Sequence, residues 1–235
     1  MNVKVKICGI TSVADGLAAA EAGADMIGLM FYEKSPRHIT LQAAAEIARQ
    51  LPPSLTKVGV FVNATEEFIA RAIGECGLGL LQFHGEETPE FCTQFGVMSM
   101  KAFRIRDAAS LAALPDYQTN AYLLDAYSAS GLGGTGEKFN WDLAVEAQKF
   151  GRPIFLAGGL TPENVAAAVR QVRPFGVDVS SGVESAPGKK DAAKVKNFIE
   201  VVVSFLRLFF DVHFFHRREY MHRPRRVLPF VEEET

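Results

Sequence analysis

Apolar and polar residues alternate from the first residues of the chain. Between Val3 and Ile7 three apolar residues alternate with two lysines, which is the two-residue period of a β-strand. The run leads into Cys8 and Gly9, and Ser12 then has the character of a helix N-cap. The pattern therefore predicts a strand that ends at a thiol and is followed by a helix.

Short apolar runs of the same kind recur along the chain, about 18–33 residues apart. The predicted strands are Val3–Ile7, Met26–Phe31, Lys57–Val62, Leu80–Phe83, Met98–Phe103, Ala121–Asp125, Ile154–Ala157 and Val177–Ser180.

Segments with helical composition lie between these strands, and most of them end at glycine or proline. The predicted helices are Val13–Ala22, Leu41–Leu51, Thr65–Cys76, Pro89–Phe95, Ala108–Leu114, Asn140–Phe150, Pro162–Val172 and Asp191–Val203. Thr161 is the expected N-cap of the seventh helix, with Pro162 at its first position.

Strict alternation of strand and helix predicts parallel strands joined by crossover helices, an α/β fold. Eight such units favour a single (β/α)8 TIM barrel over residues 1–205. An open, doubly wound sheet is the alternative, and it is less natural with eight units. Residues 206–235 do not continue the repeat, and we expect a C-terminal extension that is partly helical or disordered.

This extension contains five phenylalanines, six arginines and three of the five histidines of the chain. Such a composition could lie on a membrane surface, pack against the barrel or promote self-association, but it is a weak membrane signal. We expect an incidental extension without a function of its own.

The composition narrows the class of protein. The net charge of −2 gives no sign of a nucleic-acid partner. The three cysteines form no CxxC pair and are odd in number, which indicates neither a disulfide framework nor a zinc site. No signal peptide or membrane-spanning run is predicted. We therefore expect a cytoplasmic protein with no nucleic-acid or membrane partner.

Cys8 and Asp125 end the first and sixth predicted strands, so a barrel would place both at one mouth. A thiol and a carboxyl there could form an acid–base pair. Because Gly9 follows Cys8, we expect this thiol to be more exposed than a core cysteine, with a pKa lowered by a cation or a helix N-terminus. The alternatives are a small buried apolar residue for Cys8 and a turn residue for Asp125.

Three further polar residues follow or end strands. Arg37 could bind a substrate carboxylate or be a solvated loop residue. His84 could contact substrate or be satisfied by local hydrogen bonds. Asp178 could hold a substrate hydroxyl or simply pair with a lysine or arginine.

Loops rich in glycine and serine follow the sixth, seventh and eighth strands. Small residues there allow a phosphate to approach free backbone N–H groups, although tight turns are the simpler explanation. The segment 131–136 matches GxGxxG but lacks the βαβ context of a dinucleotide fingerprint. The candidate phosphate ligands are Gly133, Gly134, Gly158, Gly159, Ser180, Ser181 and Gly182.

Nine motifs occur in order: KICGIT, SPRHIT, VGVFVN, LLQFHGEETPEF, KAFRI, LLDAYS, GLGGTGEKFNW, LAGGLTPENV and VDVSSGVESAPGKKD. Together they resemble the phosphoribosylanthranilate isomerase family of tryptophan biosynthesis, from about Val3 to about Phe205. The resemblance implies a (β/α)8 barrel without metal or cofactor. It also implies an Amadori rearrangement of a small phosphorylated aminosugar.

The resemblance also implies roles for single residues. The cysteine of KICG, Cys8, would be the general base and the aspartate of LLD, Asp125, the general acid. The arginine of SPR, Arg37, would bind the anthranilate carboxylate, and Asp178 would contact sugar hydroxyls. The backbones of GGTG, AGGL and SSG would hold the phosphate.

Two other interpretations stay open at this stage. A related barrel such as indole-glycerol-phosphate synthase would share the phosphate loops but would use lysines in place of the thiol. An inactive barrel could act as a binding subunit, although the presence of Cys8, Asp125 and Arg37 argues against it. The sequence leaves open a monomer or a homodimer, and acceptance of the related aminoaldose of histidine biosynthesis.

Overall fold

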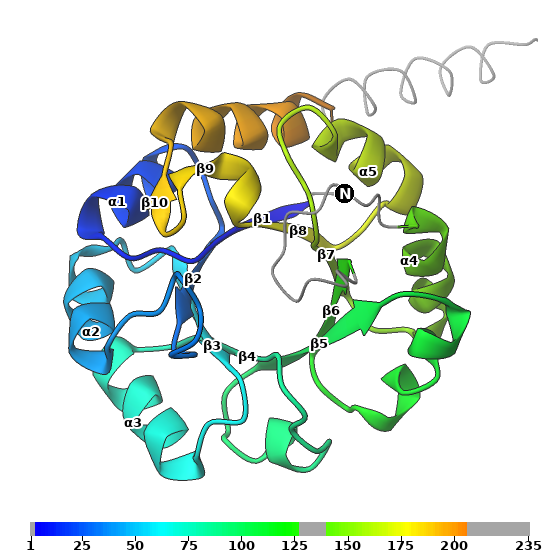
Figure 1. Cartoon of the computed structure of the whole chain (residues 1–235), viewed down its shortest axis with the longest axis horizontal. Helices are drawn as coiled ribbons and strands as arrows, with labels where there is room; N and C mark the ends of the chain where they lie inside the picture. Colours follow the sequence, from blue (N-terminus) through cyan, green and yellow to red (C-terminus); the bar gives the residue numbers. More distant parts are fainter. Residues whose placement is uncertain (1–2, 127–139, 206–235) are drawn as a thin grey trace, which may run out of the picture.

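The computed structural model describes residues 3–126 and 140–205. Eight parallel strands close into a barrel in chain order, with β8 hydrogen-bonded to β1. Figure 1 views the ring end-on, with helices around its outside. The predicted (β/α)8 barrel is confirmed, and the open sheet is excluded. The strands are β1 (Lys4–Cys8), β2 (Met26–Met30), β3 (Thr56–Phe61), β4 (Leu80–Phe83), β5 (Ser99–Ile105), β6 (Ala121–Ala126), β7 (Ile154–Leu156) and β8 (Gly176–Val179).

Helices surround most of the ring. They are α1 (Val13–Glu21), α2 (Leu41–Gln50), α3 (Glu66–Cys76), α4 (Trp141–Ala147), α5 (Val165–Val172) and an unlabelled helix over 192–205. The side chains of Ser12, Thr40 and Thr65 each accept a hydrogen bond from a backbone N–H in the first turn of α1, α2 and α3. The N-cap predicted at Ser12 is therefore confirmed. Short hydroxyl side chains suit this position because they accept from backbone N–H groups that have no partner within the helix.

Two predicted helices were wrong. Pro89–Phe95 contains only a 3₁₀ turn at Phe91–Thr93. Ala108–Leu114 is replaced by two 3₁₀ turns, Ala108–Leu111 and Leu114–Asp116. Isolated helices of this length are marginal in water, so tertiary contacts and not composition decide whether such a segment becomes helical. In the second, the proline after Leu114 disfavours helical backbone at that residue.

The predicted start of α5 was also wrong. The helix begins at Val165 after Asn164, and Pro162 lies in the preceding turn. The side-chain oxygen of Asn164 accepts a hydrogen bond from the backbone N–H of Thr161, and its amide donates to the carbonyl of Gly159. Thr161 is therefore part of a turn closed by Asn164 and does not cap the helix.

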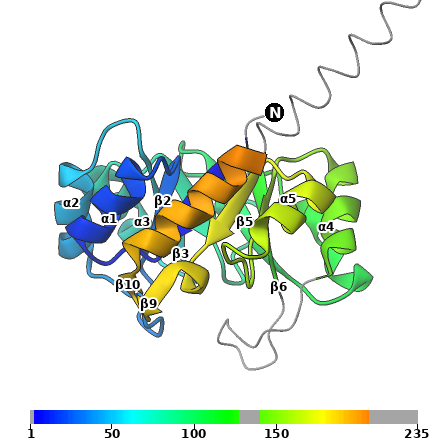
Figure 2. The same cartoon turned by 90° about the horizontal axis from the view of Figure 1, so that it is seen from above.

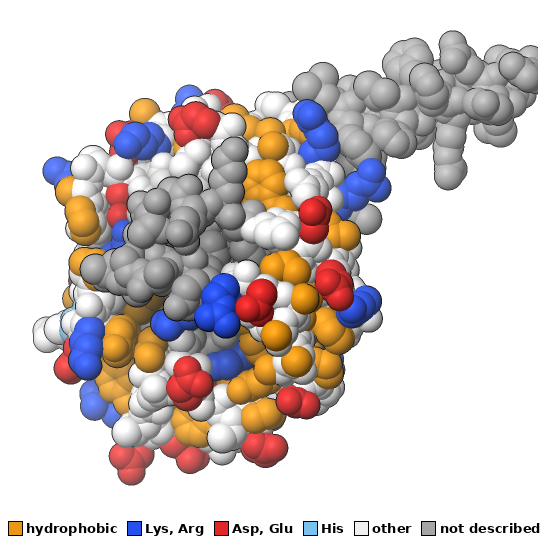
Figure 3. All heavy atoms as spheres, turned by 45° about the vertical axis from the view of Figure 1, so that its right-hand side comes forward, with side chains coloured by type: hydrophobic (Ala, Val, Ile, Leu, Met, Phe, Trp, Pro, Cys, Tyr) orange, Lys and Arg blue, Asp and Glu red, His pale blue; other side chains and the backbone are white. Residues whose placement is uncertain are grey.

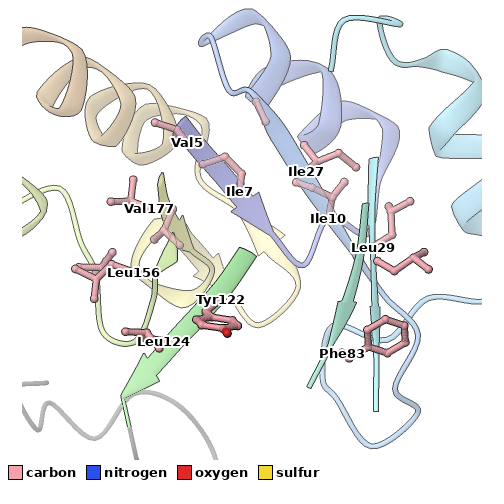
Figure 4. Packing of buried hydrophobic residues seen from close by; sticks show 14 of the residues in the cluster. Val5, Ile7, Ile10, Ile27, Leu29, Phe83, Tyr122, Leu124, Leu156 and Val177 are labelled. Atoms are coloured by element: carbon pink, nitrogen blue, oxygen red, sulfur yellow. The ribbon is translucent and has the colours of Figure 1, made fainter. Parts of the chain in front are cut away.

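The two faces of each strand have different surroundings. Val5, Ile7, Ile27 and Leu29 belong to the main core, which also contains residues of the surrounding helices. Figure 4 shows these side chains on the helix side of β1 and β2. The alternate residues point into the barrel, where a second apolar cluster lies. Its members are Val58, Leu80, Met100, Ala102, Ala121, Leu123, Phe155 and Ala157.

A short hairpin follows β8. The strands β9 (Glu184–Ala186) and β10 (Lys189–Lys190) pair antiparallel, and Figure 2 shows them beyond one end of the barrel. Thr11 donates a hydrogen bond to the carbonyl of Gly188, and Asp15 accepts one from the backbone N–H of Lys190. The hairpin is therefore fastened to the loop and helix that follow β1.

Charged side chains of both signs are interspersed on the face shown in Figure 3. Within the ranges 3–126 and 140–205, no helix is long and apolar enough to cross a membrane. The extension at 206–235 lies outside the described residues, so its separation from a barrel domain at 1–205 stays a prediction.

The outer helix over 192–205 should contribute strongly to stability through Phe198, which is fully buried in the main core. We expect Phe198→Ala to lower the free energy of unfolding by about 3–5 kcal/mol, because it removes apolar contacts and leaves a cavity. Urea unfolding followed by circular dichroism measures the loss. Val203→Ala, an exposed change on the same helix, is the control, and an equal loss in both variants would contradict this packing.

Candidate active site

A cavity lies at the carboxyl ends of the barrel strands. Its lining includes Cys8 from β1, His84 after β4, Asp125 from β6 and Asp178 from β8, together with Arg37 from the loop after β2. These residues are far apart in the chain and face one space because all five lie on barrel-facing positions or strand-end loops. The predicted meeting of Cys8 and Asp125 at one mouth is confirmed.

Cys8 is more buried than the sequence predicted, with only 6% of its surface exposed. It is the last residue of β1, so the strand extends beyond the predicted end at Ile7. A Cβ atom on the neighbouring Gly28 would lie 2.7 Å from the sulfur, so only glycine leaves room for the thiol. Burial raises the pKa of the Cys8 thiol, and the charge of Lys6 opposes that shift without cancelling it. The lowered pKa expected from the sequence is therefore wrong: the pKa of Cys8 lies above its usual value.

Asp178 pairs with a lysine inside the barrel. Its Oδ1 lies 2.8 Å from Nζ of Lys6, and the Lys6 side chain is completely buried. The two residues face each other in the register of β1 and β8. Of the two roles that the sequence left open for Asp178, the structure shows the ion pair.

Arg37 is held by a buried carboxylate from the hairpin. Its Nε and Nη2 atoms donate to the two oxygens of Glu184 at 2.8 and 2.7 Å. Lys190 donates to the same carboxylate at 2.7 Å. Burial alone would raise the pKa of Glu184, but the hydrogen bonds from Arg37 and Lys190 outweigh it and the pKa lies below its usual value. The arrangement orients the guanidinium toward the cavity.

Gly9 allows Arg37 to lie over the end of β1. Its φ is +76°, and a Cβ atom there would be 2.5 Å from Cδ of the arginine. Any other residue at this position would meet both a strained backbone and the arginine side chain.

His84 and Asp125 lie on the opposite side of the mouth. Nε2 of His84 is 3.6 Å from Oδ2 of Asp125, and its Nδ1 is 3.2 Å from Nε2 of Gln82. The Oε1 atom of Gln82 is the one buried side-chain polar atom without a hydrogen-bond partner among the described residues. Because Gln82 lines the cavity, this oxygen is available to a donor on a ligand.

The loops after β7 and β8 approach each other closely. Gly158 and Gly159 adopt φ of +83° and +65°. A Cβ atom on Gly182 would lie 2.0 Å from the carbonyl oxygen of Leu160, so the two loops touch only because this residue is glycine. Ser180 and Ser181 line the cavity together with Gly158 and Gly159. Gly133 and Gly134 lie outside the described residues.

Several residues of the site escaped the sequence analysis: Lys6, Gln82, Glu184 and Lys190. Lys6 and Gln82 were detectable from their spacing. Lys6 lies two positions before Cys8 on β1, and Gln82 lies two positions before His84, which directly follows β4, so each shares the face of its candidate. Glu184 and Lys190 carried no such signal, since the hairpin that brings them to Arg37 is a tertiary feature.

The site suits acid–base chemistry on an anionic small molecule. It combines a thiol and a carboxyl with a tethered arginine and two glycine loops. Across 3–126 and 140–205, no group of three or more histidine, cysteine, aspartate or glutamate side chains is placed to hold a metal ion.

Known proteins resemble the chain over most of its length. The family model described as N-(5'phosphoribosyl)anthranilate (PRA) isomerase matches residues 5–201. The N-(5'-phosphoribosyl)anthranilate isomerases of Trichlorobacter lovleyi and Citrifermentans bemidjiense are 56% and 59% identical to it. The alignments cover 84% and 83% of this chain and 96% and 95% of those proteins.

Solved structures agree with the sequence relatives. Phosphoribosyl anthranilate isomerase from Thermotoga maritima superposes with a TM-score of 0.82 at 41% identity, covering 86% of this chain and 99% of that one. A structure of phosphoribosyl anthranilate isomerase in complex with reduced 1-(o-carboxyphenylamino)-1-deoxyribulose 5-phosphate has a TM-score of 0.78 at 40% identity, with coverage of 86% and 99%.

The buried carboxylate of Glu184 should stabilise the protein in a pH-dependent way. Its folded-state pKa is lowered, so its contribution is complete above the unfolded pKa, about 4.3, and is lost as the pH falls through the folded pKa. We expect Glu184→Gln to cost about 1.5–3 kcal/mol at pH 7, because the hydrogen bonds from Arg37 and Lys190 lose their charged acceptor.

Urea unfolding at a series of pH values measures this cost. The difference from wild type should be constant down to about pH 5 and should shrink below about pH 4. Glu86→Gln, at an exposed position of the loop after β4, is the control. A cost that stays the same at every pH would show that the charge of Glu184 is not what stabilises the hairpin.

Proposed function

Since the chain belongs to the N-(5'-phosphoribosyl)anthranilate isomerase family, it is an isomerase of tryptophan biosynthesis, and we propose that Cys8 and Asp125 carry its proton transfers. The reaction is the Amadori rearrangement of N-(5'-phosphoribosyl)anthranilate to 1-(o-carboxyphenylamino)-1-deoxyribulose 5-phosphate. The assignment of this activity rests on the family match. The observation that supports the residue roles is that a thiol and a carboxyl from strands far apart in the chain line one cavity.

Asp125 is the proposed general acid. In its protonated form it donates a proton to the ring oxygen of the ribose, and the bond between that oxygen and C1 breaks. The nitrogen lone pair forms a cationic imine with C1. His84, 3.6 Å away, lies where it can orient the carboxyl group of Asp125.

Cys8 is the proposed general base. As a thiolate it removes the proton from C2, which the neighbouring cationic imine makes acidic, and the resulting enolamine tautomerises to the ketone. Burial raises the pKa of Cys8, so the resting side chain is a thiol. The positive charge of the imine beside the sulfur then favours the thiolate, which ties formation of the base to the presence of the intermediate.

Arg37 is the proposed ligand of the anthranilate carboxylate. Glu184 occupies Nε and one donor of Nη2, and a guanidinium has five N–H donors in a rigid fork. The remaining donors are therefore held in a fixed direction. This orientation suits a planar carboxylate better than a flexible side chain would.

The loops after β7 and β8 are the proposed phosphate site. Gly158, Gly159, Ser180, Ser181 and Gly182 place small residues where a phosphate can reach backbone N–H groups, at the position where barrels commonly bind this group. Gly133 and Gly134 remain proposed ligands outside the described residues. Asp178 is proposed to contact a sugar hydroxyl while it pairs with Lys6.

The related indole-glycerol-phosphate synthase is disfavoured as an alternative because the family match is to the isomerase. The cytoplasm is the proposed compartment, and the three unpaired cysteines support a reducing environment. For the oligomeric state, the relatives include both forms: monomers were generated from the dimeric Thermotoga maritima enzyme. A monomer or a homodimer is proposed for this chain.

Removing either proton-transfer group should abolish most of the activity. We expect Cys8→Ser and Asp125→Asn each to lower kcat by about 10²–10⁴-fold, the usual worth of a general acid or base. A fluorescence assay that follows the loss of phosphoribosylanthranilate measures the rates. Cys76→Ala, a buried cysteine on α3, is the control and should retain activity. Near-normal rates in either site variant would remove that residue from the mechanism.

The contact between the two glycine loops should determine substrate affinity. Gly182→Ala adds a methyl group 2.0 Å from the carbonyl oxygen of Leu160, so the loops must separate. We expect KM to rise by about tenfold or more, the effect of losing one to two charge-assisted hydrogen bonds, and inorganic phosphate to inhibit less. Gly74→Ala, where the new methyl group meets open space, is the control. An unchanged KM in folded Gly182→Ala would place the phosphate elsewhere.

A further inference from the structure

A lysine lies completely buried inside the barrel, beside the thiol. Lys6 is among the largest fully buried side chains of the described residues. It stands two residues before Cys8 on β1, and both side chains face the interior of the barrel. Burying an ammonium group costs desolvation free energy that an apolar residue of similar volume would avoid. The presence of a lysine at this position therefore indicates a role for its charge.

We propose that Lys6 is the counter-ion of Cys8, a positioning residue whose fixed charge stabilises the thiolate. Asp178 pairs with the same ammonium group and so weakens this stabilisation. The proposal deepens the proposed function, because it rests on Cys8 as the base of the isomerisation.

The geometry of β1, β2 and β8 supports this assignment. Gly28 pairs with Cys8 in the register of β1 and β2. A Cβ atom on Gly28 would lie 2.7 Å from the sulfur of Cys8 and 3.1 Å from Nζ of Lys6. The thiol and the ammonium therefore share the small space that this glycine leaves open. Across the next strand pair, Asp178 holds the same ammonium at 2.8 Å.

Four charged groups act on Cys8 from the elements packed around it. Lys6 and Lys190 stabilise the thiolate, Asp178 opposes it, and Arg37 interacts with the charge on the sulfur. After burial itself, Lys6 is the largest influence on the pKa of Cys8 and lowers it.

Lys6 differs from the other two cations in its partners. Arg37 and Lys190 are both held by the carboxylate of Glu184, whereas Lys6 shares the space beside Gly28 with the sulfur of Cys8. Lys6 has one carboxylate, Asp178, and lies where solvent does not screen its field. The chain therefore places a fully desolvated cation beside the one cysteine that lines the cavity.

The test measures the thiolate of Cys8 directly in the free, full-length protein. Iodoacetamide alkylation between pH 7 and pH 10 is followed by peptide mass spectrometry, which resolves Cys8 from the other cysteines. Burial raises the pKa of Cys76 to about 11 and that of Cys92 to about 12, so these thiols react little in this range. The position of the rate curve along the pH axis reports the pKa, and its height reports access.

Two variants should move the curve in opposite directions. With Lys6→Gln, the curve should shift to higher pH by about one unit or more, which is tenfold slower alkylation at a given pH. With Asp178→Asn, it should shift to lower pH, because the carboxylate that opposes the thiolate is removed and Lys6 loses its other partner. Lys4→Gln is the matched control on the same strand, since Lys4 is part-exposed and pairs with Asp25, and its curve should coincide with that of wild type.

An unchanged curve in folded Lys6→Gln would overturn the proposal. If Lys6→Gln does not fold, Lys6→Met, which keeps the length of the buried side chain without its charge, takes its place: a shift to higher pH supports the proposal, and an unchanged or lower position overturns it. Isomerase activity of the wild-type protein is measured separately. Shifted curves in a protein without that activity would refute the proposed function alone, whereas activity with unmoved curves would refute only the role of Lys6.

Discussion

Closure of the barrel is the constraint on which the rest of the structure depends. Once β8 pairs with β1, every second side chain of each strand points into a shared interior, and the strands end at one rim. Cys8, Gln82, Asp125 and Asp178 face the same cavity for this reason. Much of the interior is apolar, with Met100, Leu123 and Phe155 among its side chains, and the polar groups of the site lie toward the carboxyl ends of the strands.

The ion pairs at this rim are strengthened because little water surrounds them. Lys6 with Asp178, and Arg37 with Glu184 and Lys190, are cations and carboxylates held at hydrogen-bonding distance with little exposure. Charges with so little solvent around them interact more strongly than surface pairs do. The first pair acts on the thiol, and the second fixes the direction of the arginine. Together they supply an electrostatic setting suited to an anionic ligand and to the proposed role of Cys8 as a thiolate base.

Three glycines allow the close approaches that this setting needs. Gly28 leaves space for the thiol and the ammonium, Gly9 lets Arg37 lie over the end of β1, and Gly182 lets the loops after β7 and β8 touch. Each approach places backbone or charged atoms where a side-chain carbon would otherwise lie. The arrangement of the candidate reactive groups and of the proposed phosphate loops therefore depends on these glycines as much as on the polar side chains.

The sequence alone determined the fold class and the eight strands, and it indicated Cys8 and Asp125 as a pair. These properties follow from local patterns: the two-residue period, the strand–helix alternation and the position of Cys8 and Asp125 at strand ends. The roles of base and acid within that pair came from the family resemblance. The 3₁₀ turns after β4 and β5 were missed because composition alone does not decide whether so short a segment becomes helical. The start of α5 was missed because the side chain of Asn164 closes a turn before the helix. The burial of Cys8, the pairing of Lys6 with Asp178 and the tether of Arg37 to Glu184 were decided only by the tertiary structure. Desolvation and long-range ion pairs depend on which strands become neighbours, and no local pattern contains that information.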